Sequence, residues 1–508
     1  MLGRTIGATL IGATAIRISV EAYVGLGLPM CIIVGLPDSA IKESRSRIEA
    51  ALKSSGFDEP SRRTVINLAP ADIRKEGSAL DLPIALAKLC GLGFVSEAAL
   101  DGYMFAAELG LDGALRGVPG AVILARGCRD AGMRGIVVAE ENGPEAALID
   151  GIEVLSARSL THVVAAFRGE EPFSRPKPLI ENERLDPVAC FSHVRGQLTA
   201  KRALVIAAVG GHHVLLSGPP GVGKTMLCER FVGLLPDLSE PQRTEVLALH
   251  SLNGTPRPSR RPPLRAPHHS LSVAALVGGG SKPRPGEISL AHHGVLFLDE
   301  LAEFRTEALN ALRQPLESGV AVIARALRHV SFDARFQLIA ATNPCPCGFL
   351  THETKACACS AKDIERYRAR LNGPITDRFD MRIDVSGAVT SGGMAETTAT
   401  LRGQVAAARA FARASGRSGL NRSLQGTELF SEVRATAAAW ALLEAEVARL
   451  ELSQRALDRV LRVARSIADL AASERTEDAH VSEALVLRLG EVMTPAASRD
   501  GRGRTLQA

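Results

Sequence analysis

The sequence is poor in aromatic residues and in cysteine. Phe, Trp and Tyr make up 4% of the 508 residues, and Trp440 is the sole tryptophan. Proteins that stack single-stranded nucleic acid on aromatic side chains need more of them, so contacts to a polyanion would come from Arg and Lys. The nine cysteines are too few for the disulfide framework of a secreted chain of this length.

Long apolar runs are also missing. No stretch of about 18 uninterrupted apolar residues occurs, which excludes an obvious transmembrane helix. The weak apolar run over residues 1–20 is broken by Arg4 and Arg17 and lacks a clear cleavage site. We therefore expect a cytoplasmic protein with no membrane partner.

The overall charge is small for a chain of this size. Lys and Arg number 60 against 55 Asp and Glu, a net charge of +5, so any basic surface for nucleic acid must be local. Hydrophobic residues at 46% and charged residues at 23% are typical of folded globular proteins. The length predicts about three domains.

Composition and periodicity divide the chain into five segments. Short β-rich runs alternate with helical patterns in the first, and strongly apolar strands precede polar residues in the third. The segments are an N-terminal α/β or α+β domain (residues 1–170), a Pro-rich linker (171–187), an α/β core (188–386), an all-helical domain (387–492) and a flexible tail (493–508).

Individual elements follow from the same patterns. Strands are predicted at residues 15–20, 30–34, 64–68, 135–139, 213–217, 294–298 and 336–340. Helices are predicted at residues 39–55, 81–90, 226–235, 363–371, 404–414 and 455–471.

A phosphate-binding motif follows the apolar strand at residues 213–217. The string GPPGVGKT at residues 218–225 fits G-x-x-x-x-G-K-[ST] and precedes a helical run. Its glycines allow backbone N–H groups to face phosphates, while Lys224 reaches the β- and γ-phosphates and Thr225 coordinates Mg²⁺. The nucleotide-binding residues are Gly218, Pro219, Pro220, Gly221, Val222, Gly223, Lys224 and Thr225.

Two carboxylates end the next apolar strand. Asp299 and Glu300 follow the run VLFL, and a nucleotide site needs one carboxylate for Mg²⁺ and one to polarise the attacking water. We assign Asp299 to Mg²⁺ and Glu300 to general-base catalysis. A further strand ends at Asn343, which is a candidate to orient the water, although Asn also caps turns for local reasons.

Four cysteines are grouped near Asn343. Cys345 and Cys347 are separated by nine residues from Cys357 and Cys359. Four thiolates at this spacing can form a tetrahedral Zn²⁺ site, although C-x-C is tighter than the usual C-x₂-C. A structural zinc that fixes the loop after Asn343 and four unligated thiols are the two alternatives.

The order of these motifs resembles an AAA+ ATPase module with Walker A, Walker B and sensor 1. Three longer strings narrow the resemblance to the YifB/ComM family of magnesium-chelatase-like AAA+ ATPases: RAPHH at residues 265–269, VGGGSKPRPGEISLAH at 277–292 and NPCPCG at 343–348. The resemblance implies a parallel P-loop sheet with a helical lid, and a cofactor pair of ATP and Mg²⁺. It covers nearly the whole chain.

The N-terminal segment resembles the Lon C-terminal, or ribosomal S5 domain 2-like, fold. The matching strings are VGLPD at residues 34–38, VINLAPAD at 65–72 and RKEGSALDLP at 74–83. Lon-type proteases carry a nucleophilic serine where this sequence has Ala79, and Ser78 lies one residue early. We therefore expect no protease activity.

Two arginines complete the module by resemblance. Arg378, in the string GPITDRFD, matches the arginine finger that reaches the γ-phosphate of a neighbouring subunit. Arg455 matches sensor 2, a lid arginine that contacts the nucleotide. Active sites shared between subunits imply a homo-oligomeric ring, most simply a hexamer. Taken alone, either arginine is more typical of a surface salt bridge.

DNA contacts are expected at two loops. Residues 316–331 predict a β-hairpin around Arg325 and Arg328, which in related motors points into the ring pore. Lys282 and Arg284 lie in a Gly- and Pro-rich insert before Walker B. Such side chains bind phosphates without base specificity, and a solvated charged hairpin is the alternative.

The resemblance implies an ATP-driven motor that acts on branched or single-stranded DNA, specifically a branch-migration helicase of natural transformation. One alternative is a magnesium-chelatase motor subunit, against which we count the N-terminal domain. Others are an ATP-dependent remodeller of a protein client and a scaffold that binds ATP without turnover. Fold likeness does not fix a substrate.

Overall fold

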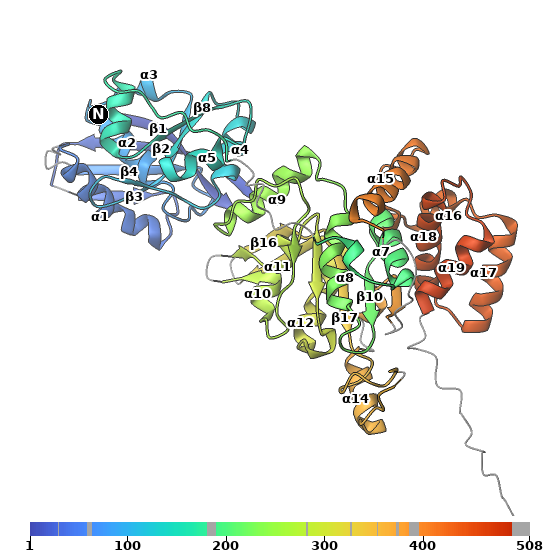
Figure 1. The fold of residues 1–508 in the computed structure, drawn as a ribbon. Helices are drawn as coiled ribbons and strands as arrows, with labels where there is room; N and C mark the ends of the chain where they lie inside the picture. Colours follow the sequence, from blue (N-terminus) through green and yellow to red (C-terminus); the bar gives the residue numbers. More distant parts are fainter. Residues whose placement is uncertain are drawn as a thin grey trace, which may run out of the picture.

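The computed structural model describes residues 1–28, 30–57, 63–179, 189–280, 283–325, 328–352, 354–371, 375–385 and 396–489. The tail predicted at residues 493–508 lies outside this range, as do the side chains of residues 324–329. An N-terminal α/β domain, a central sheet module and a C-terminal group of helices follow one another in Figure 1. Among the described helices, none is both long and apolar enough to cross a membrane.

The N-terminal domain is built on a seven-stranded sheet with the order β3-β4-β2-β1-β5-β8-β9. Its strands are β1 (Leu2–Ile11), β2 (Thr14–Gly25), β3 (Met30–Val34), β4 (Arg63–Ala69), β5 (Tyr103–Ala106), β8 (Gly135–Ala139) and β9 (Glu153–Ala157), and β6 (Glu108–Leu109) pairs with β7 (Leu115–Arg116) outside the sheet. Its helices are α1 (Ser39–Ser54), α2 (Asp81–Gly91), α3 (Glu97–Leu100), α4 (Ala121–Asp130), α5 (Gly143–Ala146) and α6 (Leu160–Phe167). Parallel and antiparallel pairs are mixed, so the α+β prediction holds.

Strand β1 is absent from the predicted elements, and its glycines explain why. Gly3 and Gly7 weaken a strand pattern. A Cβ at Gly3 would lie 2.2 Å from the Ala87 carbonyl oxygen, and one at Gly7 would lie 2.7 Å from Leu80. The glycines therefore allow α2 to pack directly on β1.

The beginning of the predicted linker belongs to the N-terminal domain. Ser156 and Ser174 exchange backbone hydrogen bonds of 2.9 and 3.2 Å at the β9 edge, and Phe173 packs against the domain's core. Residues 180–188, which include the rest of the predicted linker, lie outside the described residues. The N-terminal domain thus extends past residue 170.

The central module is a five-stranded parallel sheet with the order β11-β14-β17-β10-β18. Its strands are β11 (Leu264–Arg265), β14 (Val295–Leu298), β17 (Gln337–Thr342), β10 (Val214–Ser217) and β18 (Met381–Asp384). Helices around it are α7 (Leu198–Gly210), α8 (Lys224–Phe231), α9 (Glu240–Leu252), α10 (Val273–Val277), α11 (Glu287–Leu290), α12 (Thr306–Ala311), α13 (Arg313–Ser318) and α14 (Ala361–Leu371). Apolar clusters cover both faces, which is why the strands read as continuous hydrophobic runs.

Two small antiparallel ribbons project from this module. The hairpin of β15 (Val320–Arg325) and β16 (Arg328–Asp333) confirms the predicted β-hairpin before β17. The second ribbon pairs β12 (Gly278–Gly279) with β13 (Arg284–Pro285). The two ribbons touch, because a Cβ at Gly278 would lie 2.8 Å from Ile323 Cδ1.

The C-terminal domain is helical, as predicted. It consists of α15 (Thr398–Ala414), α16 (Gly426–Val433), α17 (Ala437–Leu450), α18 (Gln454–Leu470) and α19 (Asp478–Leu489). Buried residues of α15 and α18 share one apolar cluster with α7 and β10 of the central module. The lid and the sheet module are therefore joined through a common core.

Helix α9 connects the N-terminal domain with the hairpin. Leu247 is buried in the same apolar cluster as Val122 of α4, and Ser251 donates a hydrogen bond to the buried carboxylate of Glu145. Leu249 instead belongs to the cluster of the β15–β16 hairpin, with Phe332. Figure 1 shows α9 between the two bodies.

Candidate functional site

The GPPGVGKT loop links the buried strand β10 to helix α8, as its motif requires. Gly221 and Gly223 have φ values of 80° and 91°, a region that favours glycine. A Cβ at Gly218 would lie 2.2 Å from the Val385 carbonyl oxygen, so only glycine fits there. The loop therefore presents backbone N–H groups next to the first turn of a helix.

Lys224 is the first residue of α8 and its side chain folds back over the loop. Its Nζ donates to the carbonyl oxygens of Gly218 at 2.7 Å and Pro219 at 2.8 Å. A third bond of 3.1 Å goes to Asn343 Oδ1 at the end of β17. Burial lowers the pKa of the Lys224 ammonium, which is 8% exposed.

The strand-end acids meet the same loop. Asp299, directly after β14, accepts a 2.8 Å hydrogen bond from Thr225 Oγ1 and a 2.9 Å bond from the Glu300 N–H. A threonine hydroxyl beside a carboxylate is the oxygen donor set that Mg²⁺ prefers. Glu300 has a φ of 52°, unusual for a residue with a side chain, and its carboxylate is 57% exposed.

The structure thus brings the central predicted residues together at one edge of the sheet. Strand β17 lies between β10 and β14, so Asn343 is placed between the nucleotide loop and the acids. The gathered side chains are those of Lys224, Thr225, Asp299 and Asn343, and the backbone N–H of Glu300 is bonded to Asp299.

Arg378 lies elsewhere, at the opposite end of the sheet. Val214 pairs with Met381 and Ser217 with Asp384, so β10 and β18 run in the same direction. Arg378 precedes β18 and thus lies at the amino ends of the strands, whereas the nucleotide loop leaves their carboxyl ends. Its guanidinium, 16% exposed, forms an ion pair with Glu317 of α13.

Arg455 lies on the surface in the first turn of α18. Among the described residues, no hydrogen bond or ion pair of its side chain is found. The structure therefore does not bring Arg455 into contact with the gathered set.

Sequence reasoning missed two partners of the candidate site. His269 Nδ1 lies 3.7 Å from Glu300 Oε2. It belongs to the RAPHH string, which carried the family resemblance but had no assigned role. Glu317 pairs with Arg378, and no local pattern marks it, because the two residues meet only in the folded chain.

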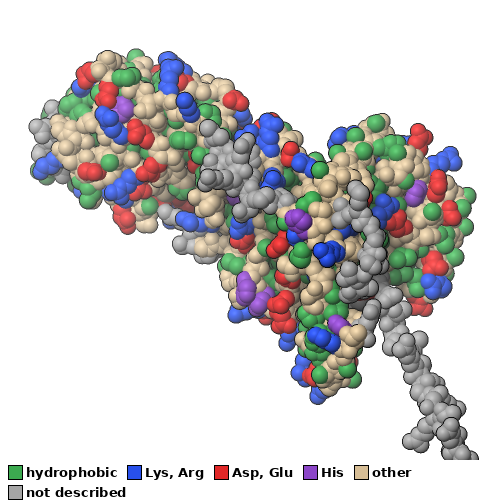
Figure 2. Space-filling view, in the orientation of Figure 1, with side chains coloured by type: hydrophobic (Ala, Val, Ile, Leu, Met, Phe, Trp, Pro, Cys, Tyr) green, Lys and Arg blue, Asp and Glu red, His purple; other side chains and the backbone are tan. Residues whose placement is uncertain are grey.

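The residues predicted for DNA contact lie on the two ribbons. Arg284 is exposed on β13, whereas Lys282 lies outside the described residues. Arg325 and Arg328 are the last backbone pair in the register of the hairpin. On the face drawn in Figure 2, Lys and Arg side chains are scattered rather than gathered in one patch, which agrees with the small net charge.

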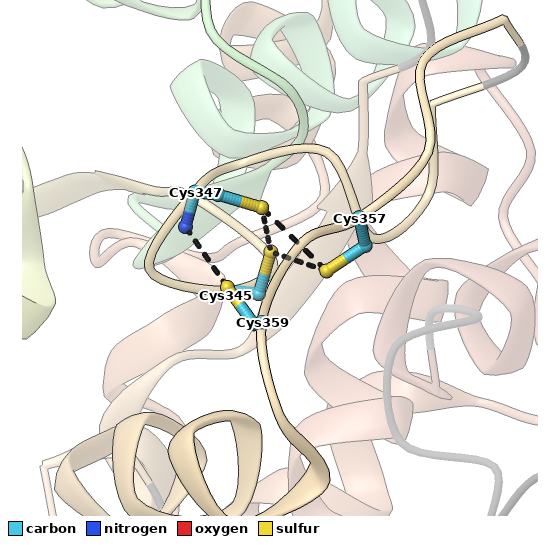
Figure 3. A group of neighbouring side chains, drawn as sticks. All are labelled: Cys345, Cys347, Cys357 and Cys359. Atoms are coloured by element: carbon cyan, nitrogen blue, oxygen red, sulfur yellow. Dashed lines mark hydrogen bonds between the residues drawn. The ribbon is translucent and has the colours of Figure 1, made fainter.

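The four clustered cysteines converge in the loop between β17 and α14 (Figure 3). The sulfur of Cys345 lies 3.4 Å from that of Cys347 and 3.7 Å from that of Cys357, and all four sulfurs lie within 4.8 Å of one another. Tetrahedral Zn²⁺ with bonds of about 2.3 Å places sulfurs about 3.8 Å apart, so the group fits zinc. The N–H groups of Phe349 and Ala358 lower the pKa of the Cys347 thiol to about 6, whereas burial raises the pKa of the Cys345 thiol.

This cysteine loop touches the nucleotide loop. A Cβ at Gly348 would lie 2.6 Å from Pro220 Cδ and 3.8 Å from Asn343 Cγ. The described residues also line an open pocket of about 550 Å³ beside Cys347 and Cys359, with Tyr367 of α14 in its wall. A shift of the cysteine loop would therefore displace Pro220 and alter the surroundings of Asn343.

A second cluster of possible metal ligands does not fit a metal. Glu245 of α9 lies 3.1 Å from His292 Nε2 and 2.7 Å from His293 Nε2. Burial lowers the pKa of His292 to about 4, and its Nδ1 accepts the Arg335 N–H at 3.0 Å. The proton of this neutral ring is therefore on Nε2, where it binds Glu245 rather than a cation.

Comparison with known families gives matches over three stretches. The family described as Magnesium chelatase, subunit ChlI, matches residues 190–392. Subunit ChlI of Mg-chelatase matches residues 20–142, and Magnesium chelatase, subunit ChlI C-terminal, matches residues 395–488. The matches therefore extend from the N-terminal domain to the lid.

Individual relatives cover nearly the whole chain. The uncharacterized protein YifB of Escherichia coli is 43% identical over 493 residues, covering 94% of this chain and 95% of that protein. The competence protein ComM of Haemophilus influenzae is 40% identical over 490 residues, again 94% and 95% of the two chains. The chain belongs to the YifB/ComM family of magnesium-chelatase-like AAA+ ATPases.

Membership in the YifB/ComM family confirms the predicted resemblance and the P-loop sheet module. The magnesium-chelatase 38 kDa subunit of Rhodobacter capsulatus is 27% identical over 192 residues, 34% of this chain and 55% of that protein. Because a family described as a chelatase subunit matches residues 20–142, the N-terminal domain does not by itself argue against a chelatase motor. What separates the chelatase subunit from YifB and ComM is the share of this chain that each covers, 34% against 94%.

Proposed function

We propose that this YifB/ComM family member is a ring-forming ATPase motor that acts on DNA in the cytoplasm, as a branch-migration helicase in recombination and natural transformation. The observation that carries the motor part is the meeting of Lys224, Thr225, Asp299 and Asn343 at one sheet edge. The DNA part rests on the 40% identity to a competence protein.

Each gathered residue has a role in ATP hydrolysis. The loop and Lys224 bind the phosphates of ATP, and the bonds that Lys224 now makes to the protein are exchanged for phosphate oxygens. Thr225 and Asp299 would hold Mg²⁺, which would supply positive charge to neutralise the charge that develops on the transferred phosphoryl group. Glu300 accepts a proton from the attacking water and Asn343 orients that water.

The position of Arg378 supports a ring. Strand β18 is four residues long, which corresponds to about 13 Å between its two ends. The guanidinium therefore lies remote from the nucleotide loop of its own chain and is suited to the γ-phosphate of a neighbouring subunit. We propose a hexamer in which Arg378 acts as the arginine finger and Arg455 as the sensor 2 arginine.

DNA would pass the two ribbons. Arg284 of one ribbon and the Arg325–Arg328 pair of the other lie on elements that touch each other through Gly278 and Ile323. With Lys282 of the same insert, they would bind phosphates without reading bases, so affinity falls with salt.

Zinc is proposed as a structural cofactor held by Cys345, Cys347, Cys357 and Cys359. The spacing of the sulfurs carries this proposal. A closed set of four thiolates fixes the loop after Asn343 and leaves no open position for catalysis.

The experiment that tests the proposed function measures ATP hydrolysis by the full chain, alone and with single-stranded, duplex and four-way-junction DNA, at two salt concentrations. DNA is expected to stimulate turnover, less so at higher salt. In the presence of ATP, the branch point of the four-way junction is expected to migrate until the junction separates into two duplexes. Lys224→Ala is the inactive control, and Glu300→Gln should bind ATP without turnover.

Two outcomes would replace the proposal. Turnover that responds to no DNA would favour a protein client, and the absence of turnover with retained ATP binding would favour a scaffold. Proteolysis of a denatured protein substrate is not expected, since Lys75 Nζ is buried and bonded to the Pro70 carbonyl rather than to a serine.

A further inference from the structure

The cysteine loop between β17 and α14 gathers four thiols that no step of ATP hydrolysis uses. The sulfurs of Cys345, Cys347 and Cys357 lie 3.4 to 3.7 Å from one another, and that of Cys359 lies within 4.8 Å of all three (Figure 3). A disulfide joins two sulfurs at about 2.0 Å, so small movements would close one. The group can therefore exist in two covalent states, as four thiolates on Zn²⁺ or as two disulfides.

Two of the four cysteines border the open pocket of about 550 Å³ beside this loop. Cys347 and Cys359 line it, whereas Cys345 is fully buried. The charged residues of the lining are Glu303, Asp363, Arg366 and Arg370. Because two acids balance two bases, a small neutral oxidant such as hydrogen peroxide can enter the pocket. Thiolate oxidation depends on such access.

The spacing along the chain favours disulfides between the two C-x-C segments. A bond from Cys345 to Cys347 would close a ring of three residues and strain the disulfide torsion, whereas one from Cys347 to Cys357 spans eleven. The sulfurs of Cys347 and Cys357 are 3.5 Å apart. This pairing leaves Cys345 for Cys359, so each pair contains one of the pocket-lining cysteines.

The loop that carries these thiols also supports the nucleotide edge. Asn343, at its start, accepts a 3.1 Å hydrogen bond from Lys224. A Cβ at Gly348 would lie 2.6 Å from Pro220 Cδ, which shows how closely the loop packs on the nucleotide loop. A change in the covalent state of the cysteines would therefore act on both contacts.

We propose that the four-cysteine group is an oxidation site, at which a peroxide converts the zinc-bound thiolates into two disulfides and thereby slows ATP hydrolysis. The bonds join Cys347 to Cys357 and Cys345 to Cys359. This inference rests on the proposed zinc site and the proposed ATPase. A dithiol reductant returns the four thiolates and is itself oxidised to a disulfide, after which the chain can take up Zn²⁺ again.

Each disulfide forms in two steps. The Cys347 thiolate attacks one oxygen of hydrogen peroxide and breaks the O–O bond, which gives a sulfenic acid and hydroxide. The Cys357 thiolate then attacks the sulfenic sulfur, forms the S–S bond and releases a second hydroxide. The two sulfurs lose two electrons, and one peroxide with two protons becomes two waters. Once the second pair has reacted in the same way, the chain releases Zn²⁺ because no thiolate ligand remains.

The test treats the reduced, zinc-loaded full chain with graded hydrogen peroxide. It follows zinc released to a chromogenic chelator, the disulfide pairing and ATP turnover. One Zn²⁺ per chain should be released as the disulfides form, and turnover should fall about tenfold, as expected when groups that support a site are lost. A dithiol reductant with added Zn²⁺ should restore turnover.

Tryptic peptides report the pairing directly. Lys355 lies between the two C-x-C segments, so trypsin separates residues 336–355 from residues 356–362. The proposed disulfides keep these two peptides linked, whereas bonds within either segment leave them apart. Fragmentation of the linked pair should identify Cys347 with Cys357.

Two variants assign the effect to this loop. Cys190→Ser removes a partly buried thiol elsewhere, whose sulfur accepts the Thr398 N–H at 3.4 Å, and should release zinc and lose turnover like the wild type. Cys357→Ser lacks one of the four thiolates and should keep its low turnover at every peroxide concentration. Thermal unfolding of both variants reports whether the chain stays folded.

Three results would overturn the inference. Zinc that stays bound while peroxide oxidises Cys190 shows that the group is inert. Tryptic peptides that stay apart after zinc release contradict the pairing, and equal peroxide sensitivity of Cys357→Ser places the inactivation elsewhere. A reduced chain without zinc refutes the proposed metal site. One with zinc but without turnover refutes the proposed ATPase, while zinc release and peptide linkage still decide on the oxidation.

Discussion

The two ends of the five-stranded sheet carry polar side chains of opposite character. At the carboxyl ends, Lys224 bonds to Asn343 and Thr225 bonds to Asp299, through contacts that a nucleotide and its cation can replace. At the amino ends, Asp380 is 3% exposed and accepts the His213 N–H at 2.9 Å. The side chains at the carboxyl ends can exchange their hydrogen bonds for contacts with a ligand, whereas those at the amino ends keep their buried partners.

The amino-end network joins the sheet to the lid. Besides His213, Asp380 faces His212 at 3.8 Å and Arg459 of α18 at 3.7 Å. Burial alone would raise the pKa of Asp380, but the neighbouring His212 and the charges of His213 and Arg422 lower it. A buried carboxylate held ionised by His212, His213 and the lid residue Arg422 makes the lid a fixed part of the core, whereas the nucleotide edge stays adaptable.

The largest effect is expected at the carboxyl ends, from Lys224→Ala. Loss of the ammonium that binds the phosphates should reduce ATP turnover by about a hundredfold or more. The melting temperature should change little, because the bonds of Lys224 go to loop carbonyls and to Asn343. A large loss of stability would show that this edge is not adaptable.

Asp380→Asn should have the converse effect, a loss of stability. Removing one partner from a buried charge network costs about 3 kcal/mol. Asp377→Asn is the matched control, since the Asp377 side chain is 70% exposed and its ion pair with Arg382, at 4.0 Å, is long and weak. Denaturant unfolding of both variants measures the difference, and equal stabilities would contradict a fixed amino end.

The same network predicts a direction with pH. Because the pKa of Asp380 is lowered in the folded chain, its contribution is present above the pKa of an unfolded aspartate, about 3.9, and lost as the pH falls below it. Unfolding of Asp380→Asn should therefore depend less on pH in the acid range than that of the wild type.

Metal analysis sharpens the picture of the catalytic edge. We expect one zinc per chain, lost in Cys357→Ser and retained in Cys190→Ser. Because Gly348 contacts Pro220 and lies near Asn343, loss of the metal should also reduce ATP turnover by about tenfold. Full turnover in a zinc-free Cys357→Ser variant would show that the cysteine loop and the nucleotide loop act independently.

The smallest effect is expected from Glu317→Gln. The ion pair with Arg378 is partly exposed on the glutamate side, so its loss should lower the turnover of the assembled ring about two- to threefold through a less fixed arginine finger. Glu307→Gln on the neighbouring helix α12 is the control. Unchanged turnover in Glu317→Gln would mean that Arg378 is positioned by other groups.

Much of the catalytic edge was predictable from local sequence. Strands β10, β14 and β17 are largely apolar runs. The nucleotide loop follows β10, Asp299 follows β14 and Asn343 follows β17, so each motif marks the end of its own strand. In a parallel sheet those ends lie at one edge, and the meeting of the residues follows.

What the sequence did not predict depends on contacts between distant segments. His269 meets Glu300 only because β11 pairs with β14, and the two-residue strand β11 has no recognisable pattern. Glu317 pairs with Arg378, and Asp380 lies beside Arg459 of the lid, only in the folded chain. No spacing in the sequence indicates either pair. Strand β1 was missed because the glycines that lower its propensity serve the approach of α2.

Helix α9 has a consequence for how such chains can be recombined. Its residue Leu247 fits the core of the N-terminal domain, while Leu249 fits the core of the hairpin, two positions along the same helix. A boundary drawn between the domains in the linker would leave this helix matched to the wrong neighbour in a chimera. An N-terminal domain grafted from a relative therefore needs that relative's α9 as well, so the natural unit of exchange is discontinuous in sequence.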